Sequence, residues 1–89
     1  MAETFHLNII TPDRKVYDGE VESLVAPGSL GYLGVLAHHA PFMTTLSPGA
    51  ITVRDRSGKT IAFNSSGGGF MEVLNNKATL LADSAQPRP

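Results

Sequence analysis

Short runs of β-branched and aromatic residues recur along this chain, and each run is bounded by Gly, Pro, Asn, Asp or Ser. In the first run, Phe5, Leu7 and Ile9 alternate with polar residues, which is the two-residue period of a strand with one buried face. No window of about 11 residues holds the i, i+3, i+4, i+7 apolar pattern of a helix. The sequence therefore predicts an all-β fold, a flattened β-sandwich or barrel of about ten short strands.

Local turn signals separate the predicted strands. The Asp-Gly pair at residues 18–19 predicts a tight hairpin with positive φ, inside a meander of the first three runs. Ser-Pro-Gly at residues 47–49 has the composition of a type II turn, about which a second pair of strands should hinge. Residues 54–59 read as a polar hairpin tip, and Asn75 and Asn76 separate the last two predicted strands.

Size and composition indicate one domain without disulfide bonds. The chain has 89 residues, no cysteine and 42% hydrophobic residues, which is enough for one core. We predict a single domain over residues 1–85 and a flexible tail over residues 86–89, whose two prolines exclude a helix. A net charge of −1 offers no basic surface to nucleic acid. Because no signal pattern and no apolar stretch of about 20 residues is present, we expect membrane contact only through partner proteins.

Residues 31–41, Gly-Tyr-Leu-Gly-Val-Leu-Ala-His-His-Ala-Pro, are too punctuated for a helix and too apolar for an ordinary loop. Gly31 and Gly34 permit backbone conformations or close approaches that a side chain would block. Pro41 favours an extended conformation at Ala40. We interpret the segment as a partly buried docking surface. The apolar residues expected to cluster near it are Leu30, Tyr32, Leu33, Leu36, Phe42 and Met43.

No pattern in the chain assigns catalytic, cofactor-binding or metal-binding residues. His38 and His39 are adjacent, so in an extended chain they point to opposite faces, and no cysteine supplements them. The run Ser-Ser-Gly-Gly-Gly at residues 65–69 lacks the lysine and the following helix of a phosphate-binding loop, and close strand packing or a bulge explains its glycines better. Glu20 and Glu22 share a strand face that we interpret as solvated.

An ordered set of short motifs resembles the N-terminal β-sandwich domain of the epsilon subunit of F-type rotary ATP synthases. The similarity extends from Phe5 to Asp83, with little or no insertion. The motifs are Gly28-Ser29, Gly31, Leu33-Gly34, His39-Ala40-Pro41, Pro48-Gly49, Ser66-Gly67-Gly68 and Leu81-Ala82-Asp83.

The resemblance implies a ten-stranded sandwich at the foot of the central stalk, present as one copy between the gamma subunit and the c ring. It implies a rotor subunit without catalysis or cofactor, which helps to couple proton translocation to ATP synthesis. The implied location is the cytoplasmic face of a bacterial inner membrane, with the stromal face of a plastid thylakoid as the alternative. The residues expected on the c-ring side are Gly31, Tyr32 and Leu33, and those expected on the gamma side are His39, Ala40 and Pro41.

Two departures from the family pattern stand out. Many relatives carry a glutamate at the position of Tyr32, whereas the loop around it is neutral here. Either the ring loops of this species are less basic, or Tyr32 replaces charge pairing by aromatic and hydroxyl contact. Longer relatives continue into an inhibitory two-helix hairpin after the segment that matches residues 81–83, so we hypothesise a naturally short form without that hairpin.

Two other classes of protein stay open from the residues alone. A free-standing β-sandwich that binds a ligand, of the carbohydrate-binding or cupin type, would use Tyr17 and Tyr32 as stacking surfaces. A histidine-dependent metalloenzyme would contain metal in stoichiometric amount. A stable one-to-one complex with gamma is expected of the rotor subunit and of neither alternative.

Overall fold

The computed structural model describes residues 3–88 and contains nine strands within them. No helix occurs in this range, so no helix there is long and apolar enough to cross a membrane. The prediction of an all-β fold of about ten strands is confirmed. The strands are β1 (Phe5–Ile10), β2 (Lys15–Gly28), β3 (Gly31–Leu36), β4 (Phe42–Leu46), β5 (Gly49–Asp55), β6 (Thr60–Ser65), β7 (Gly69–Leu74), β8 (Lys77–Ala82) and β9 (Gln86–Pro87).

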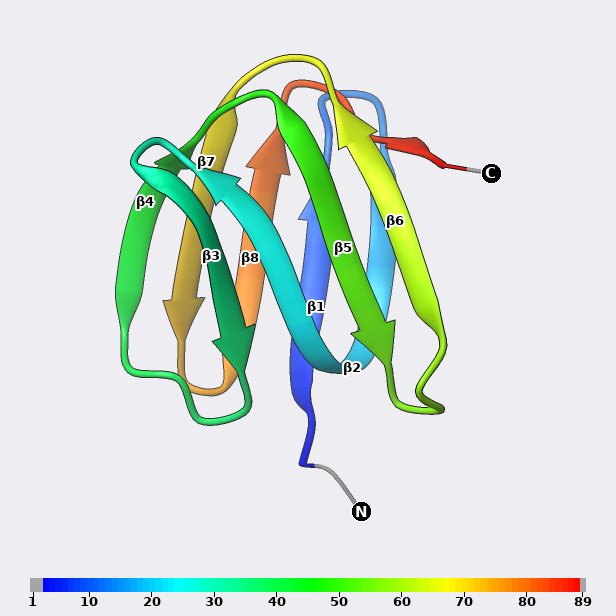
Figure 1. Ribbon diagram of the computed structural model, residues 1–89, viewed down its shortest axis with the longest axis vertical. Coiled ribbons are helices and arrows are strands. Elements are labelled where there is room, and N and C mark those ends of the chain that lie inside the picture. The colour runs from blue at the N-terminus through cyan, green and yellow to red at the C-terminus, as the bar shows by residue number, and fades with distance from the viewer. Residues whose placement is uncertain (1–2, 89) are drawn as a thin grey trace.

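The strands form two layers that share β2 (Figure 1). The first half of β2 pairs with β1, and its second half pairs with β3 and β5. One layer continues from β2 through β5 and β6 to β9, and the other runs from β1 through β8 and β7 to β4. Because Gly28 at the end of β2 also pairs with Leu46 of β4, the second layer closes on itself. The result is a flattened sandwich with barrel character.

The core lies between the two layers. Phe5, Leu7 and Ile9 of β1 are fully buried there, as their alternation predicts. They meet Val21 and Leu24 of the shared strand β2 within one contiguous cluster. The other buried members of the cluster are Ala26, Val35, Leu46, Ile51, Val53, Phe63, Met71, Val73, Ala78, Leu80 and Ala85.

The hairpin predicted at residues 18–19 is wrong. Both residues lie inside β2, opposite Asn8 and Leu7 of β1. The chain turns earlier, at residues 11–14, where the amide of Thr11 donates to the carbonyl of Arg14 at 2.9 Å. The predicted meander of three runs is therefore a two-strand pair, because ladder pairing along β2 outweighs the local turn preference of Asp-Gly.

The other turn signals fare differently. Pro48 lies in a bend and Gly49 begins β5, but the strands on either side, β4 and β5, pair with different partners. The segment therefore crosses between layers and is not a hinge of two paired strands. Two hairpins are confirmed: Gly58 (φ 87°) lies in the β5–β6 turn, and Asn75 and Asn76 (φ 51° and 58°) form the β7–β8 turn. The glycines at 67–69 allow close packing, since a Cβ on Gly69 would collide with the Leu81 carbonyl oxygen.

The end of the described chain differs from the flexible tail expected over residues 86–89. Gln86 and Pro87 form β9 and pair with Asn64 and Phe63 of β6. The amide of Arg88 then donates to the carbonyl of Ala62 at 2.8 Å. The boundary predicted at residue 85 thus precedes a short strand that still belongs to the sheet, and residue 89 lies outside the described residues.

Candidate subunit interface

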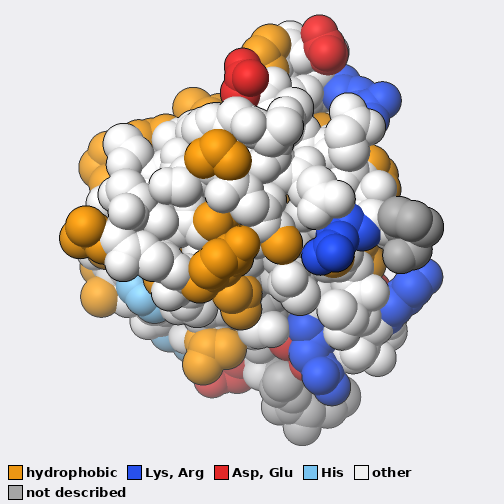
Figure 2. Space-filling view, turned by 45° about the horizontal axis from the view of Figure 1, so that its top comes forward, with side chains coloured by type: hydrophobic (Ala, Val, Ile, Leu, Met, Phe, Trp, Pro, Cys, Tyr) orange, Lys and Arg blue, Asp and Glu red, His pale blue; other side chains and the backbone are white. Residues whose placement is uncertain are grey.

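A long uncharged stretch occupies the middle of the chain: no Asp, Glu, Lys or Arg occurs between Glu22 and Arg54. Six of the eight exposed large hydrophobic residues of the described chain lie in this stretch, although it supplies only the second half of β2, strands β3 and β4, and most of β5. They are Val25, Leu30, Tyr32, Leu36, Phe42 and Met43. In Figure 2, apolar side chains gather on the left and in the centre, and most Lys and Arg side chains lie on the right. The lack of charged residues in this stretch is a feature of the sequence from which this surface could have been predicted.

The residues expected on the c-ring side lie at the start of β3, next to the turn between β2 and β3. Leu30 in this turn is fully exposed, and Gly31 follows it with φ 131°. Tyr32 is also exposed, and its hydroxyl accepts a hydrogen bond from the amide of Ala50 at 3.0 Å. Leu33 instead packs partly into the core. The surface at this end is therefore made by Leu30 and the ring of Tyr32.

The residues expected on the gamma side lie in the loop at the other end of β3 (Figure 1). His38 has φ 62°, and the amide of His39 donates to the Leu36 carbonyl at 3.2 Å. The His39 ring bonds through Nδ1 to the carbonyl of Ala40 at 2.7 Å and packs edge-to-face on Phe42, with centroids 6.0 Å apart. Ala40 and Pro41 are exposed. The apolar residues predicted around one loop thus divide between the two ends of β3.

A shallow apolar hollow adjoins this loop, between β4 and β7. Pro41, Phe42 and Met43 line one side, and Val73 and Leu74 line the other, together with Glu72. Leu74 is exposed although it lies far from the uncharged stretch in sequence. Sequence reasoning missed this residue because the pairing of β4 with β7, which places Val73 opposite Phe42 and so brings Leu74 to the same hollow, joins strands separated by two others along the chain.

The two adjacent histidines do not converge on a common point. His38 Nε2 lies 3.0 Å from Glu3 Oε1, whereas His39 bonds to a neighbouring carbonyl. Among residues 3–88, no group of three or more His, Asp or Glu side chains is arranged to hold a metal ion. Tyr17, which the ligand-binding alternative would use with Tyr32, packs edge-to-face on Phe63 against the core at a centroid distance of 6.3 Å. These two tyrosines therefore form no flat stacking platform.

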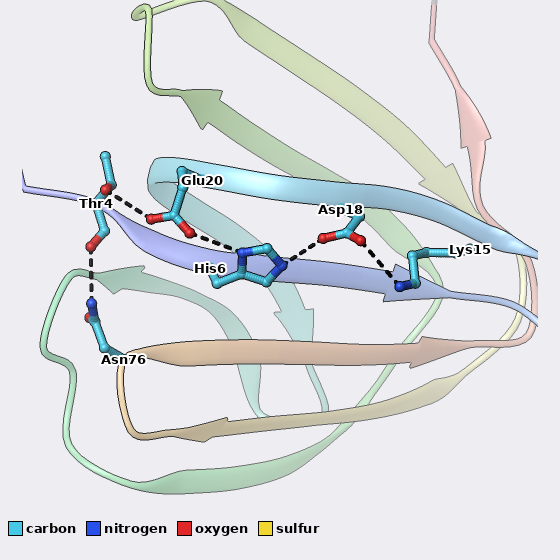
Figure 3. Close-up of polar contacts among 6 residues, drawn as sticks. All are labelled: Thr4, His6, Lys15, Asp18, Glu20 and Asn76. Carbon is cyan, nitrogen blue, oxygen red and sulfur yellow. Dashed lines mark hydrogen bonds and ion pairs between the residues drawn. The ribbon is translucent and has the colours of Figure 1, made fainter.

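A polar cluster on the outer face of β1 and β2 was not predicted. His6 stands between two carboxylates (Figure 3), with Nδ1 2.9 Å from Glu20 Oε2 and Nε2 2.6 Å from Asp18 Oδ1. Lys15 and Thr4 extend it by donating to Asp18 and Glu20, each at 3.1 Å. The sequence showed the acidic residues but not the strand register that places them opposite His6.

The contacts of this cluster shift its pKa values in opposite directions. The hydrogen bonds that the His6 ring makes to Glu20 and then to Asp18 raise the pKa of His6 despite desolvation. The pKa of Asp18 is lowered by Lys15 and His6, and that of Glu20 by His6 and Thr4. The arrangement favours a protonated imidazolium, which donates from both ring nitrogens. The cluster of His6, Asp18 and Glu20 lies on an open strand face and joins β1 to β2, so we interpret it as a clasp between these strands and not as a reaction centre.

These features define a β-sandwich whose distinguishing surface is an uncharged, apolar edge. Residues 4–88 match the family described as the β-sandwich domain of the ATP synthase delta/epsilon chain, and the chain belongs to this family.

Curated relatives support the assignment. Over 96% of its length, the chain is 43% identical to the ATP synthase epsilon chain of Mesorhizobium japonicum. It is 48% identical to that of Pelotomaculum thermopropionicum over 94%, and 45% identical to the chloroplastic chain of Cyanidioschyzon merolae over 90%. It covers 62%, 61% and 60% of these proteins, respectively, and so spans about three fifths of their length.

Solved structures show the same fold. A chain of the Euglena gracilis mitochondrial ATP synthase structure, which contains OSCP, F1 and the c ring, superposes with a TM-score of 0.88 at 26% identity, over 94% of this chain and 53% of that one. A chain of the Tetrahymena thermophila mitochondrial ATP synthase central stalk and c ring gives 0.75 at 18% identity, over 94% and 66%.

Proposed function

We propose that this domain is a non-catalytic central-stalk subunit of an F-type ATP synthase, which docks on gamma and the c ring and helps to couple proton translocation to ATP synthesis. The observation that carries the proposal is the uncharged apolar edge built on β3, in a chain of the epsilon family. Relatives named ATP synthase epsilon chain support the same role.

The geometry of β3 suits two simultaneous contacts. Gly31 and Leu36 mark its ends, so the c-ring and gamma surfaces are separated by about 17 Å at about 3.4 Å per residue. The accessible surface of the described chain is 5082 Å², and a standard interface uses about 800 Å² of each partner. Two such contacts take about a third of the surface, which leaves most of the outer strand faces in water.

The proposal extends to the setting of the complex. One copy of the domain predicted over residues 1–85, together with β9, turns with the rotor. It reaches the membrane through the c ring, on the cytoplasmic face of a bacterial inner membrane. Its c-ring surface consists of Leu30 and Tyr32 with Gly31, and its gamma surface consists of His39, Ala40 and Pro41 beside the hollow between β4 and β7.

Co-purification tests this function directly. The tagged chain, expressed with the gamma subunit and c ring of the same species, is expected to retain gamma in a one-to-one complex on size-exclusion chromatography. Adding the c ring in detergent should yield a ternary complex. A chain that elutes alone at micromolar concentrations of gamma would contradict the proposal, and so would stoichiometric metal in the purified protein.

A further inference from the structure

We propose that Asn76 is a positioning residue, which fixes the backbone of the gamma-side loop, residues 37–41, from a different part of the sandwich. This inference rests on the proposed function for the role of the loop. Asn76 lies in the turn between β7 and β8 and belongs to neither predicted docking set. A substitution of Asn76 should therefore alter docking although the residue lies outside the proposed interface.

Asn76 joins three segments that are distant in sequence. Its Oδ1 accepts a hydrogen bond from the amide of His38 at 2.7 Å, and its Nδ2 donates to the carbonyl of Thr4 at 3.0 Å. Its own carbonyl accepts from the amide of His6 at 3.2 Å. Figure 3 shows the side chain reaching Thr4, the residue before β1. One side-chain amide thus links the loop to the N-terminal strand.

The loop has few other anchors. The amide of His39 bonds to Leu36 within the same turn, and the ring of His39 bonds to its neighbour Ala40. The pair between His38 and Glu3 is largely exposed and holds the backbone weakly. Among the hydrogen bonds of the described residues, the bond from the His38 amide to Asn76 is the one that ties the loop backbone to another part of the chain.

The bond also explains how His38 is held in an unusual conformation. Its φ of 62° lies in the left-handed region, which is uncommon for residues with a side chain. Such a conformation persists where surrounding contacts fix it. The acceptor at Asn76 fixes the amide of His38, and Ala40 and Pro41, which follow in the same loop, are exposed.

Turn chemistry alone does not require asparagine at position 76. Both central residues of the β7–β8 turn have positive φ, and glycine is the residue most favoured at the second. Asn75 occupies the first position with φ 51°, is exposed, and makes no side-chain hydrogen bond among the described residues. Asn75 is therefore a matched control for Asn76.

The test compares Asn76→Gly, Asn75→Gly and Asn76→Asp. Glycine keeps the positive φ and removes the side chain, so all three variants are expected to fold. We expect the amide of His38 to exchange with solvent about five to ten times faster in Asn76→Gly, as for the loss of one hydrogen bond, and to be unchanged in Asn75→Gly. Aspartate tolerates the left-handed region and keeps the acceptor, so Asn76→Asp should restore protection.

The affinity for gamma is the second readout. We expect Asn76→Gly to bind gamma at least about threefold more weakly, while Asn76→Asp and Asn75→Gly bind like the original chain. The urea midpoint of each variant separates this effect from a loss of overall stability. Unchanged exchange at His38 in Asn76→Gly overturns the proposal, and so does unchanged gamma affinity when exchange is faster. If the original chain does not bind gamma, the proposed function and the docking role of Asn76 are both overturned. The exchange rate of the His38 amide still tests, independently of gamma, whether Asn76 holds the loop.

Discussion

His6 illustrates how one residue acquires its properties from strand pairing. Its ring lies between Glu20 and Asp18 only because residues of β1 and β2 face each other in antiparallel register. Each of the three side chains is about one third exposed or more, so water screens their attraction and the clasp is modest. The direction of the pKa shifts nevertheless determines the pH range in which this cluster stabilises the fold.

The contribution of His6 to stability is expected to depend on pH. Because its folded-state pKa is raised, the contribution is complete below about pH 6.5 and is lost as the pH rises through the folded-state value. Because the pKa values of Asp18 and Glu20 are lowered, their contribution is present above about pH 4 and is lost as the pH falls through the folded-state values. The clasp is therefore strongest between about pH 4.5 and 6.5.

Urea unfolding of His6→Gln and of the original chain, at pH 5.5 and pH 8.5, checks this expectation. The substitution should lower stability more at the lower pH. In a background with Asp18→Asn and Glu20→Gln, the difference between the two pH values should shrink. An equal loss of stability for His6→Gln at both pH values would contradict the expected pH dependence of the cluster.

Gly69 and Gly34 provide a matched pair of substitutions at the residue scale. A Cβ at Gly69 would overlap the backbone of Leu81 and Ala82 in the neighbouring strand, whereas at Gly34 the nearest atom would be the Leu24 carbonyl oxygen at 3.9 Å. We expect Gly69→Ala to lower the free energy of unfolding by about 1–3 kcal/mol. Gly34→Ala should stay within about 1 kcal/mol of the original, on the stabilising side. Chemical unfolding curves of the two variants give the comparison.

At the scale of elements, β2 holds the sandwich together. It has 14 residues and pairs with strands of both layers, so its side chains pack against the whole core. Sequence reasoning did not recognise β2 as one long strand, because the Asp-Gly pair at residues 18–19 resembles a turn. The hairpins at 54–59 and at Asn75 and Asn76 were predictable, since their turn residues and the alternation on both sides agree.

Leu24 and Val25 test the role of β2. They are neighbours on one strand, but Leu24 is completely buried and Val25 is 40% exposed on the opposite face. Leu24→Ala is expected to lower the free energy of unfolding by about 2–5 kcal/mol, because it leaves a cavity where the layers meet. Val25→Ala should cost less than about 1 kcal/mol. Thermal and urea unfolding measure both, and similar losses would contradict the two-layer account of β2.

For the molecule as a whole, β3 connects the two surfaces that we propose for gamma and the c ring. The turn at Leu30 lies at one end of this strand, and Pro41 lies in the loop beyond its other end. Sites more than about 7–10 Å apart that share no contacts are usually independent. The two interfaces should therefore be separable by substitution, which is how a rigid spacer between two subunits behaves.

Leu30→Ser and Pro41→Ala are expected to act on different partners. Leu30→Ser should weaken binding to the c ring about five- to tenfold and leave gamma affinity unchanged, since it removes an exposed apolar contact. Pro41→Ala should do the reverse, and the exposed Pro48 supplies a control in Pro48→Ala. Measured affinities of each variant for the c ring and for gamma check this expectation. The double variant tests whether the two effects add. Equal effects of Leu30→Ser on both partners would argue against two separate surfaces.

The sequence by itself determined the class of fold and the family, because alternation and ordered glycine motifs are local properties of the chain. The tertiary structure decided which strands pair, and through them three features of the protein. Pairing of β1 with β2 places His6 between its carboxylates, pairing of β4 with β7 brings Leu74 to the gamma-side loop, and the β7–β8 turn brings Asn76 to His38. These contacts join segments far apart in sequence, and they form only when the strands pair in the folded protein.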